Sequence, residues 1–263
     1  MSVTLKQLLE AGCHFGHQSR RWNPKMKPYL FTERDGVHVF DLVKTKEGLD
    51  AATEYVKNLV LGGGVIVFVG SKRQAASIVK DNAKRVGVPY VTERWLGGSF
   101  TNFGEMRKRV DRLVSLKQKR EAGELKSYTK KEQLLFDREI AKLERFFGGV
   151  ESLARVPDAV FVVDTHKEDT AVREARRLGV KIVGIVDSNG NPQEVDYLIP
   201  ANDDAVKSIE LIVAEVANAV ALGKGIPVKD SNTVEEHEEE KKPKSKKKVE
   251  KKIEDTAEEP EEV

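Results

Sequence analysis

The chain has 263 residues, of which 39% are hydrophobic and 33% charged, whereas an average domain holds about 25% charged residues. No segment reaches 18 consecutive apolar residues, which excludes a membrane-spanning helix. The single cysteine, Cys13, excludes an internal disulfide and a paired-cysteine metal motif, and it is typical of a reducing cytosol. The first ten residues lack a basic region followed by an apolar one, so we expect no secretion signal.

Charge divides the chain into two parts. Residues 1–228 hold 36 basic and 30 acidic residues, whereas residues 229–263 hold 9 and 13 and contain no arginine. The excess of basic residues in the first part suggests a polyanionic partner. The last part consists of Glu and Lys blocks with almost no apolar residue, so we expect a disordered tail over residues 227–263.

The first informative segment along the chain is Gln18–Tyr29, which reads Q-S-R-R-W-N-P-K-M-K-P-Y. Pro24 and Pro28 oppose a helix, so we expect an irregular loop. A basic loop with an aromatic residue can contact phosphates and stack on unpaired bases of RNA. A loop in which Trp22 simply packs on the core is an equally good interpretation. The cations of this loop are Arg20, Arg21, Lys25 and Lys27.

Five short runs rich in Val, Ile and Tyr predict strands. Two of them, Val65–Val69 and Val160–Val163, are continuously apolar, as are strands covered on both faces in a parallel sheet. Helical patterns alternate with the runs, which predicts right-handed crossovers and a three-layer α/β fold. The expected strands are residues 65–70, 89–93, 159–164, 181–187 and 196–201, and the expected helices are residues 71–86, 168–178 and 203–222.

A charged stretch, residues 102–148, interrupts this alternation. Apolar residues recur at Met106, Val110 and Leu113, and again from Phe136 to Phe147, in narrow stripes typical of a coiled-coil seam. We therefore expect an antiparallel helical hairpin that projects as an arm. Two ordinary helices packed on the sheet are the alternative. The predicted domains are an α/β domain (1–101 and 149–226), the arm (102–148) and the tail.

The turn Gly70-Ser71-Lys72-Arg73 tests whether the chain binds a nucleotide. It would place a capping serine and two cations at a helix N-terminus, which suits a phosphate. The sequence lacks both G-x-G-x-x-G and G-x-x-x-x-G-K-[ST]. A capped helix or a contact with an RNA phosphate is the better interpretation. An α/β protein that binds a small molecule or nucleotide remains the alternative function.

Acidic residues end three predicted strands and should gather at one edge of the sheet. No catalytic arrangement stands out, and Cys13 and His14 should point to different faces. We assign no catalytic residue, no metal ligand and no cofactor. Asp203 also fits as a helix N-cap. Whether a structural ion binds here stays open; the residues concerned are His14, His17, Asp164, Asp187, Asp203 and Asp204.

Further basic groups lie in the turn Arg94–Ser99 and on the expected arm. Residues 105–145 hold 13 basic and 8 acidic residues. A basic hairpin is a common way to grip folded RNA, although a charged face is usually just solvated. The candidate RNA-binding residues are Arg20, Arg21, Trp22, Lys25, Lys27, Lys72, Arg73, Arg94, Arg107, Lys108, Arg109 and Arg112.

Four segments resemble the bacterial family of small ribosomal subunit protein two, the universal S-two family. They are Leu8–His17, Arg94–Asn102, Pro157–Asp164 and Asp196–Ala205. The second, for example, reads R-W-L-G-G-S-F-T-N. The segments follow the family's order over residues 1 to about 226, with the arm in its expected place, and the tail falls outside the resemblance.

The resemblance implies a flavodoxin-like, doubly wound, five-stranded parallel sheet with an inserted α-helical coiled-coil hairpin. It implies a structural, non-enzymatic component of the small (30S) ribosomal subunit that binds small-subunit ribosomal RNA. It also implies that the chain helps to dock the large multi-domain ribosomal protein that recruits messenger RNA. We expect neighbouring small-subunit proteins as partners, neither membrane nor DNA, and a place on ribosomes of the bacterial cytosol. A free adaptor role, as proposed for relatives, is a further hypothesis.

Overall fold

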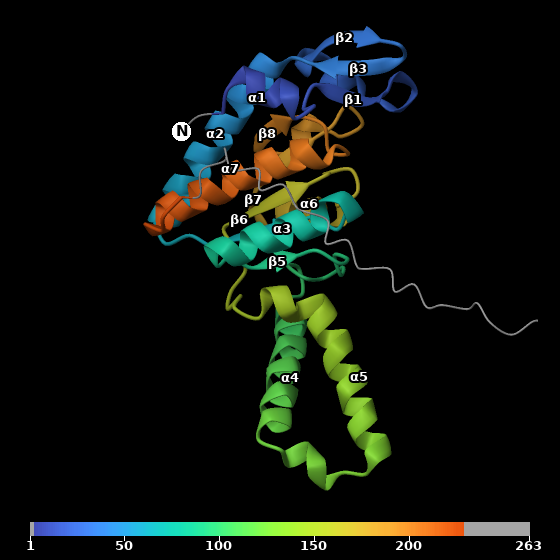
Figure 1. The fold of residues 1–263 in the computed structure, drawn as a ribbon, viewed down its shortest axis with the longest axis vertical. Coiled ribbons are helices and arrows are strands. Elements are labelled where there is room, and N and C mark those ends of the chain that lie inside the picture. The colour runs from blue at the N-terminus through green and yellow to red at the C-terminus, as the bar shows by residue number, and fades with distance from the viewer. Residues whose placement is uncertain (1–2, 229–263) are drawn as a thin grey trace, which may run out of the picture. The chain divides into compact units, whose positions relative to one another are not determined.

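The computed structural model of the protein describes residues 3–228, so the expected tail lies almost wholly outside the described residues (Figure 1). Five parallel strands form the main sheet, in the order β5-β4-β6-β7-β8. Counted along the chain this is the order 2-1-3-4-5, which defines a flavodoxin-like sheet. The strands are β4 (Ile66–Val69), β5 (Tyr90–Val91), β6 (Ala159–Val163), β7 (Lys181–Val186) and β8 (Tyr197–Pro200). All five predicted strands are confirmed.

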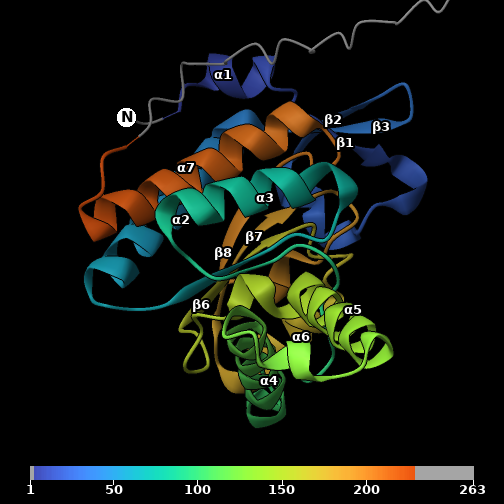
Figure 2. The same cartoon turned by 60° about the horizontal axis from the view of Figure 1, so that its bottom comes forward.

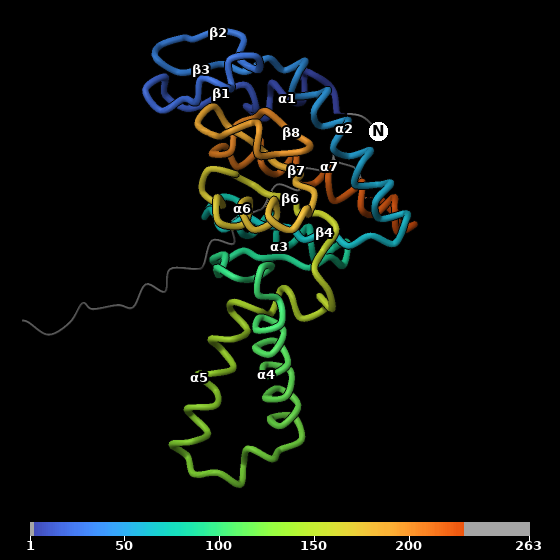
Figure 3. The backbone as a smooth tube through the Cα atoms, turned by 180° about the vertical axis from the view of Figure 1, so that it is seen from behind, coloured from blue at the N-terminus to red at the C-terminus, as the bar shows by residue number. Residues whose placement is uncertain are grey.

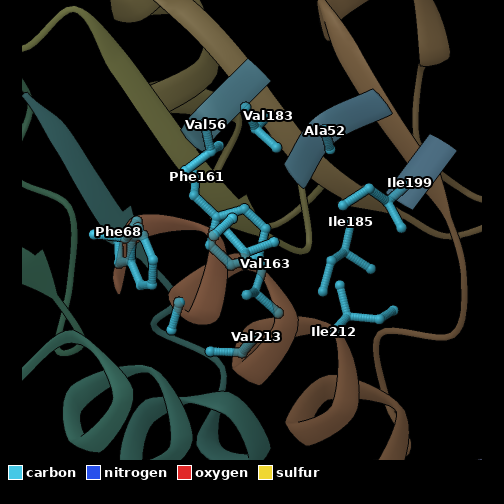
Figure 4. Close-up of a cluster of buried hydrophobic side chains, with 14 of the residues drawn as sticks. Ala52, Val56, Phe68, Phe161, Val163, Val183, Ile185, Ile199, Ile212 and Val213 are labelled. Atoms are coloured by element: carbon cyan, nitrogen blue, oxygen red, sulfur yellow. The ribbon is translucent and has the colours of Figure 1, made fainter. Parts of the chain in front are cut away.

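Helices cover both faces of this sheet (Figure 2). On one face lie α2 (Leu42–Leu61), α3 (Arg73–Val86) and α7 (Val206–Lys224), and on the other lies α6 (Asp169–Leu178). Alternate strand residues enter the two cores because successive side chains point to opposite faces. Phe161 and Val163 pack on the first face (Figure 4), while Val160 and Val162 pack on the second. Each fully buried side chain of this kind contributes about 1.5–3 kcal/mol.

Two predicted helix starts are wrong, because other hydrogen bonds take the place of the expected caps. Helix α3 has Lys72 rather than Ser71 at its N-cap, because the Ser71 amide and hydroxyl donate to Glu168 instead. Helix α7 has Ala205 at its N-cap rather than Asp203. The amides of Asp204 and Ala205 donate to the side-chain oxygen of Asn202.

Helix α2 approaches β8 very closely at Gly48. A Cβ atom on this residue would collide with the main-chain oxygen of Leu198. Thr45, one turn earlier, donates its hydroxyl to the Pro200 oxygen at 2.6 Å. Helix α2 is therefore fixed to the last strand of the sheet by a residue without a side chain and by a buried hydrogen bond.

An N-terminal unit that the sequence did not predict covers one end of the sheet. We use this name for residues 3–40. It comprises α1 (Leu5–Glu10) and an antiparallel sheet of β1 (Phe15–Gln18), β3 (Val37–Phe40) and β2 (Leu30–Arg34), in the order β1-β3-β2. Asp35 and Gly36 both have positive φ, as a type I′ hairpin turn requires. Met26 and Phe40 pack against Val186, at the end of β7.

The basic segment of this unit is more regular than expected. It forms two 3₁₀ turns, η1 (Ser19–Arg21) and η2 (Pro24–Tyr29). Pro24 stands in the first turn of η2, where its missing N–H leaves no hydrogen bond unmade. The prolines thus prevent an α-helix, as predicted, but they permit the tighter 3₁₀ turn.

Two long helices, α4 (Phe103–Glu121) and α5 (Lys130–Phe147), run antiparallel and extend away from the sheet (Figures 1 and 3). Two 3₁₀ turns, η3 (Glu124–Ser127) and η4 (Gly148–Val150), follow α4 and α5 respectively. The predicted stripe residues Val110, Leu113 and Ile140 are buried in one core, which also contains Val67 and Val160 of the main sheet. The coiled-coil geometry and the domain boundaries stay predictions. No helix within residues 3–228 could cross a bilayer.

Candidate functional site

Side chains from the carboxyl ends of the strands meet around Lys72. Its Nζ atom lies 2.6 Å from Asp204 Oδ1, 2.7 Å from Asp203 Oδ1 and 3.3 Å from Asp164 Oδ2. The predicted gathering of acids at this edge is therefore confirmed. We call these residues, together with His17 and Asp187, the strand-end cluster.

His17 reaches the cluster from β1. Its main-chain amide donates to Asp187 Oδ1 (3.1 Å) and to Ser188 Oγ (2.9 Å). Its ring places Nδ1 3.0 Å from Asp187 Oδ1 and Nε2 3.3 Å from Asp204 Oδ2. The contact with Asp187 raises the pKa of His17 to about 9, against the lowering effect of burial. The ring of His14 instead lies 3.9 Å from that of Phe15.

The cluster holds more carboxylates than its cations neutralise. Burial, reinforced by Asp187 and Asp164, raises the pKa of Asp203 to about 8. Burial lowers the pKa of Lys72, but the charges of Asp203 and the other acids more than offset this, so the pKa lies above its ordinary value. The Lys72 side chain is 12% exposed and faces these acids. We therefore leave Lys72 out of the RNA-binding surface proposed below.

A carboxylate stands where a nucleotide phosphate would bind at the start of α3. Glu168 Oε1 accepts a hydrogen bond from the Ser71 amide (2.9 Å) and another from the Ser71 hydroxyl. Glu168 is buried. The neighbouring Lys167 Nζ donates to the main-chain oxygen of Ser71. Because the chain's own anion occupies this helix N-terminus, the geometry gives no support to a nucleotide site.

Glu174 of α6 holds the turn that contains Arg94 and Trp95. Its Oε1 atom accepts from the Gly98 amide (2.7 Å) and Trp95 Nε1 (3.3 Å), and its Oε2 atom accepts from the Phe100 amide (2.9 Å). Burial raises the pKa of Glu174, but these donors more than offset it, so the pKa lies below its usual range. Trp95 is buried and packs edge-on against Phe100. The turn therefore exposes Arg94 to solvent, whereas Trp95 belongs to the core.

The basic loop, residues 18–29, lies on the turn that follows β7. The Asn23 amide donates to the Ser188 oxygen at 2.7 Å, and Lys25 Nζ donates to Gln193 Oε1 at 2.7 Å. Trp22 is half-buried, with its ring 4.8 Å from that of His38. Trp22 is therefore neither fully packed in the core nor fully exposed for stacking on an RNA base. The cations of the loop are exposed: Arg20, Arg21, Lys25 and Lys27.

The candidate cations of the hairpin differ in whether they already form contacts with other groups of the protein. Arg107 donates to the main-chain oxygens of Glu151 (3.2 Å) and Leu153 (3.1 Å), so it anchors the base of α4. Lys108 pairs with Glu105 at 2.6 Å, and Arg112 pairs with Glu139 at 3.1 Å. Arg109 is exposed.

Sequence reasoning missed two glutamates that organise this edge, Glu168 and Glu174. Glu168 and Glu174 lie in ordinary helical contexts, and their partners are about 75–100 positions away. The N-terminal hairpin, by contrast, has a signal in Asp35-Gly36 between residues of strand-forming type. That dipeptide could have revealed β2 and β3, and with them the position of His17.

The protein is thus a doubly wound α/β protein with a basic surface. The position where a nucleotide phosphate would bind is occupied by its own Glu168, and exposed cations lie at the same edge of the sheet. These features are typical of a scaffold protein. The model of the ribosomal protein S2 family matches residues 8–223, and the chain belongs to this family. Members are structural proteins of the small ribosomal subunit that take part in translation, and the family is not an enzyme family.

Proposed function

We propose that the chain binds small-subunit ribosomal RNA along the carboxyl edge of its main sheet. The observation that carries the proposal is a set of exposed cations with no ion pair to any residue within 3–228. A cation of this kind need not break a protein ion pair in order to bind a phosphate. The set contains Arg20, Arg21, Lys27, Arg73 and Arg94.

At this edge the acidic side chains lie inside the protein and the proposed RNA-binding cations lie on its surface. The acids of the strand-end cluster face Lys72 and His17 in the interior, whereas the cations above face solvent. The parallel strands β4 and β5 end beside one another, so Arg73 and Arg94 follow neighbouring strands. The function is that of a scaffold: cations offset phosphate repulsion and fix the position of the RNA, and no group performs a reaction.

Charge reversal tests the proposed edge. The variant Arg20→Glu/Arg94→Glu should bind small-subunit ribosomal RNA more weakly, with a salt slope reduced by about 0.7–0.9 for each lost phosphate contact. The matched control, Lys57→Glu/Lys80→Glu, reverses two exposed lysines of α2 and α3. Filter binding across a salt series measures both. Equal losses in the two variants would mean that only net charge matters and would overturn the proposal.

We propose further that the N-terminal unit docks the large multi-domain messenger-RNA-binding protein of the subunit. Large apolar side chains are exposed there: Phe31 is 77% exposed and Leu9 54%. Leu9→Ser/Phe31→Ser should release that protein from reconstituted subunits. The control Leu178→Ser removes a leucine that is 45% exposed on α6 and should retain it. Retention by both variants would contradict the docking proposal.

A further inference from the structure

We propose that Trp22 is a stacking site for one unpaired nucleobase of the small-subunit ribosomal RNA, with Arg20 and Arg21 holding the phosphates next to that base. The inference rests on the proposed RNA-binding function and deepens it. It assigns to the basic loop a contact with single-stranded RNA, which the cations alone would not distinguish from a duplex.

The two tryptophans of the chain are used in different ways. Trp95 is 6% exposed, belongs to the core on one face of the sheet and donates its indole N–H to Glu174. Trp22 is half-buried and belongs to none of the three hydrophobic clusters within residues 3–228. Packing in a core therefore does not account for a tryptophan at this position.

The backbone on both sides of Trp22 is fixed to the rest of the protein. The Ser19 amide donates to the Gly36 oxygen at 2.9 Å, in the turn of the N-terminal hairpin. The Asn23 amide donates to the Ser188 oxygen at 2.7 Å, in the turn after β7. The indole is thus carried by a segment that is attached at both ends.

The ring of His38 supports the indole itself. The two ring centres are 4.8 Å apart and the rings are tilted by 43°, within the range of about 4.5–7 Å at which aromatic rings attract one another. His38 lies in β3 and is 6% exposed, so this support belongs to the folded sheet. An aromatic side chain that is held in place before binding loses little conformational entropy when it binds. Because Trp22 is only half-buried, part of its ring remains open to a ligand.

The charges around Trp22 suit the backbone of a single strand. Arg20 and Arg21 precede it and Lys27 follows it, all exposed and without an ion pair to any residue within 3–228. No acidic residue occurs in the loop, residues 18–29. Every nucleotide carries a phosphate beside its base, so an aromatic ring among cations can hold both parts of the same strand.

The chemistry of the ring defines the class of ligand. In a duplex the bases stack on one another, whereas the bases of loops and bulges are free to stack on aromatic side chains. Every base has a π-face, so such stacking tolerates any sequence. We therefore expect a single-stranded segment of the RNA at Trp22, with no strong preference for one base.

Fluorescence anisotropy on the full chain tests the site, with a short oligouridine strand and an RNA duplex of the same length as probes. Trp22→Ala should weaken binding of oligouridine about 5–150-fold, the range expected for the loss of one base–aromatic stack, and should leave binding of the duplex unchanged. Trp22→Phe keeps an aromatic ring and should retain most of the affinity. The control Tyr128→Ala removes an aromatic side chain that is 47% exposed between α4 and α5 and should bind like wild type.

The salt dependence separates stacking from a merely structural role. Trp22 is uncharged, so Trp22→Ala should keep the salt slope of wild type on oligouridine. A loop that had lost its shape would displace its cations, and the slope would fall by about 0.7 for each lost phosphate contact. A reduced slope would therefore overturn the stacking site.

A readout on the wild type keeps the test decisive if a variant fails to fold. Oligouridine that contains iodouridine should crosslink to Trp22 under light, as mass spectrometry of the digested protein would show. Crosslinks confined to other residues would overturn this inference and leave the proposed RNA binding in place. So would an equal loss of oligouridine and duplex binding in Trp22→Ala. If wild type bound neither probe, the proposed function itself would fail.

Discussion

The carboxylate of Glu174 accepts hydrogen bonds from the amides of Gly98, Phe100 and Thr101 and from the indole of Trp95. A glycine-containing turn could adopt many conformations, and these donors converge on one buried anion. The position of Arg94, which lies at the start of the turn, therefore depends on a glutamate about 80 residues later in the chain.

Glu174→Gln should lower the free energy of unfolding by about 2–3 kcal/mol, because the glutamine NH₂ group would face backbone donors that need an acceptor. Urea denaturation measures the difference, with Glu210→Gln on the exposed face of α7 as control. A loss no larger than that of the control would show that the turn does not depend on the charge.

The same contact predicts a dependence on pH. The folded pKa of Glu174 is depressed, so its stabilising contribution is complete above the unfolded pKa of about 4.3 and is lost as pH falls through the lower folded value. The difference in free energy of unfolding between wild type and Glu174→Gln should therefore reach its largest value at neutral pH and decrease below about pH 4. A gap that stays constant over this range would contradict the assignment.

Sequence reasoning located some of these residues and could not locate others. Asp164, Asp187 and Asp203 follow apolar runs, and the ends of parallel strands share an edge, so their meeting was predictable. Lys72 was expected at a phosphate, but the acids that it contacts follow two strands, β6 and β8, which become its neighbours only in the folded sheet. Glu168 and Glu174 bind backbone groups, and a pattern of side chains carries no signal of that.

Two helical glycines, Gly48 in α2 and Gly104 in α4, can be compared. In Gly48→Ala the new methyl group would meet the Leu198 oxygen, so stability should fall by about 1–3 kcal/mol. Gly104→Ala in α4 meets no atom within 4 Å and should be neutral or stabilise by up to about 1 kcal/mol. Thermal denaturation measures both variants. Equal behaviour would show that α2 does not lie this close to β8.

The strands of the main sheet were easier to predict from the sequence than those of the N-terminal unit, for a physical reason. The central strands β4 and β6 are buried on both faces, and this shows in the sequence as an unbroken apolar run. The strands β1, β2 and β3 are short and half-exposed, so their pattern is weak. Their stability comes from packing against Val186 and the turn after β7, which no local window of sequence contains.

For the molecule as a whole, every buried residue of the described core precedes Leu222. A chain cut after Val228 should therefore keep its Tm within about 2 °C of wild type. Differential scanning calorimetry of the two chains makes the comparison. A larger drop in Tm would show that residues 229–263 contribute to the stability of the fold.

The closure of the N-terminal unit onto the sheet also sets an order of events during synthesis. His17 pairs with Asp187, 170 positions later, and the Asn202 amide donates to the Cys13 oxygen. At about 5–20 residues per second, the N-terminal unit is complete roughly 7–32 s before these partners are made. Its three strands can pair with one another at once, but Met26 and Phe40 have no Val186 to pack against until β7 is made, so this apolar surface stays uncovered on the nascent chain during that interval.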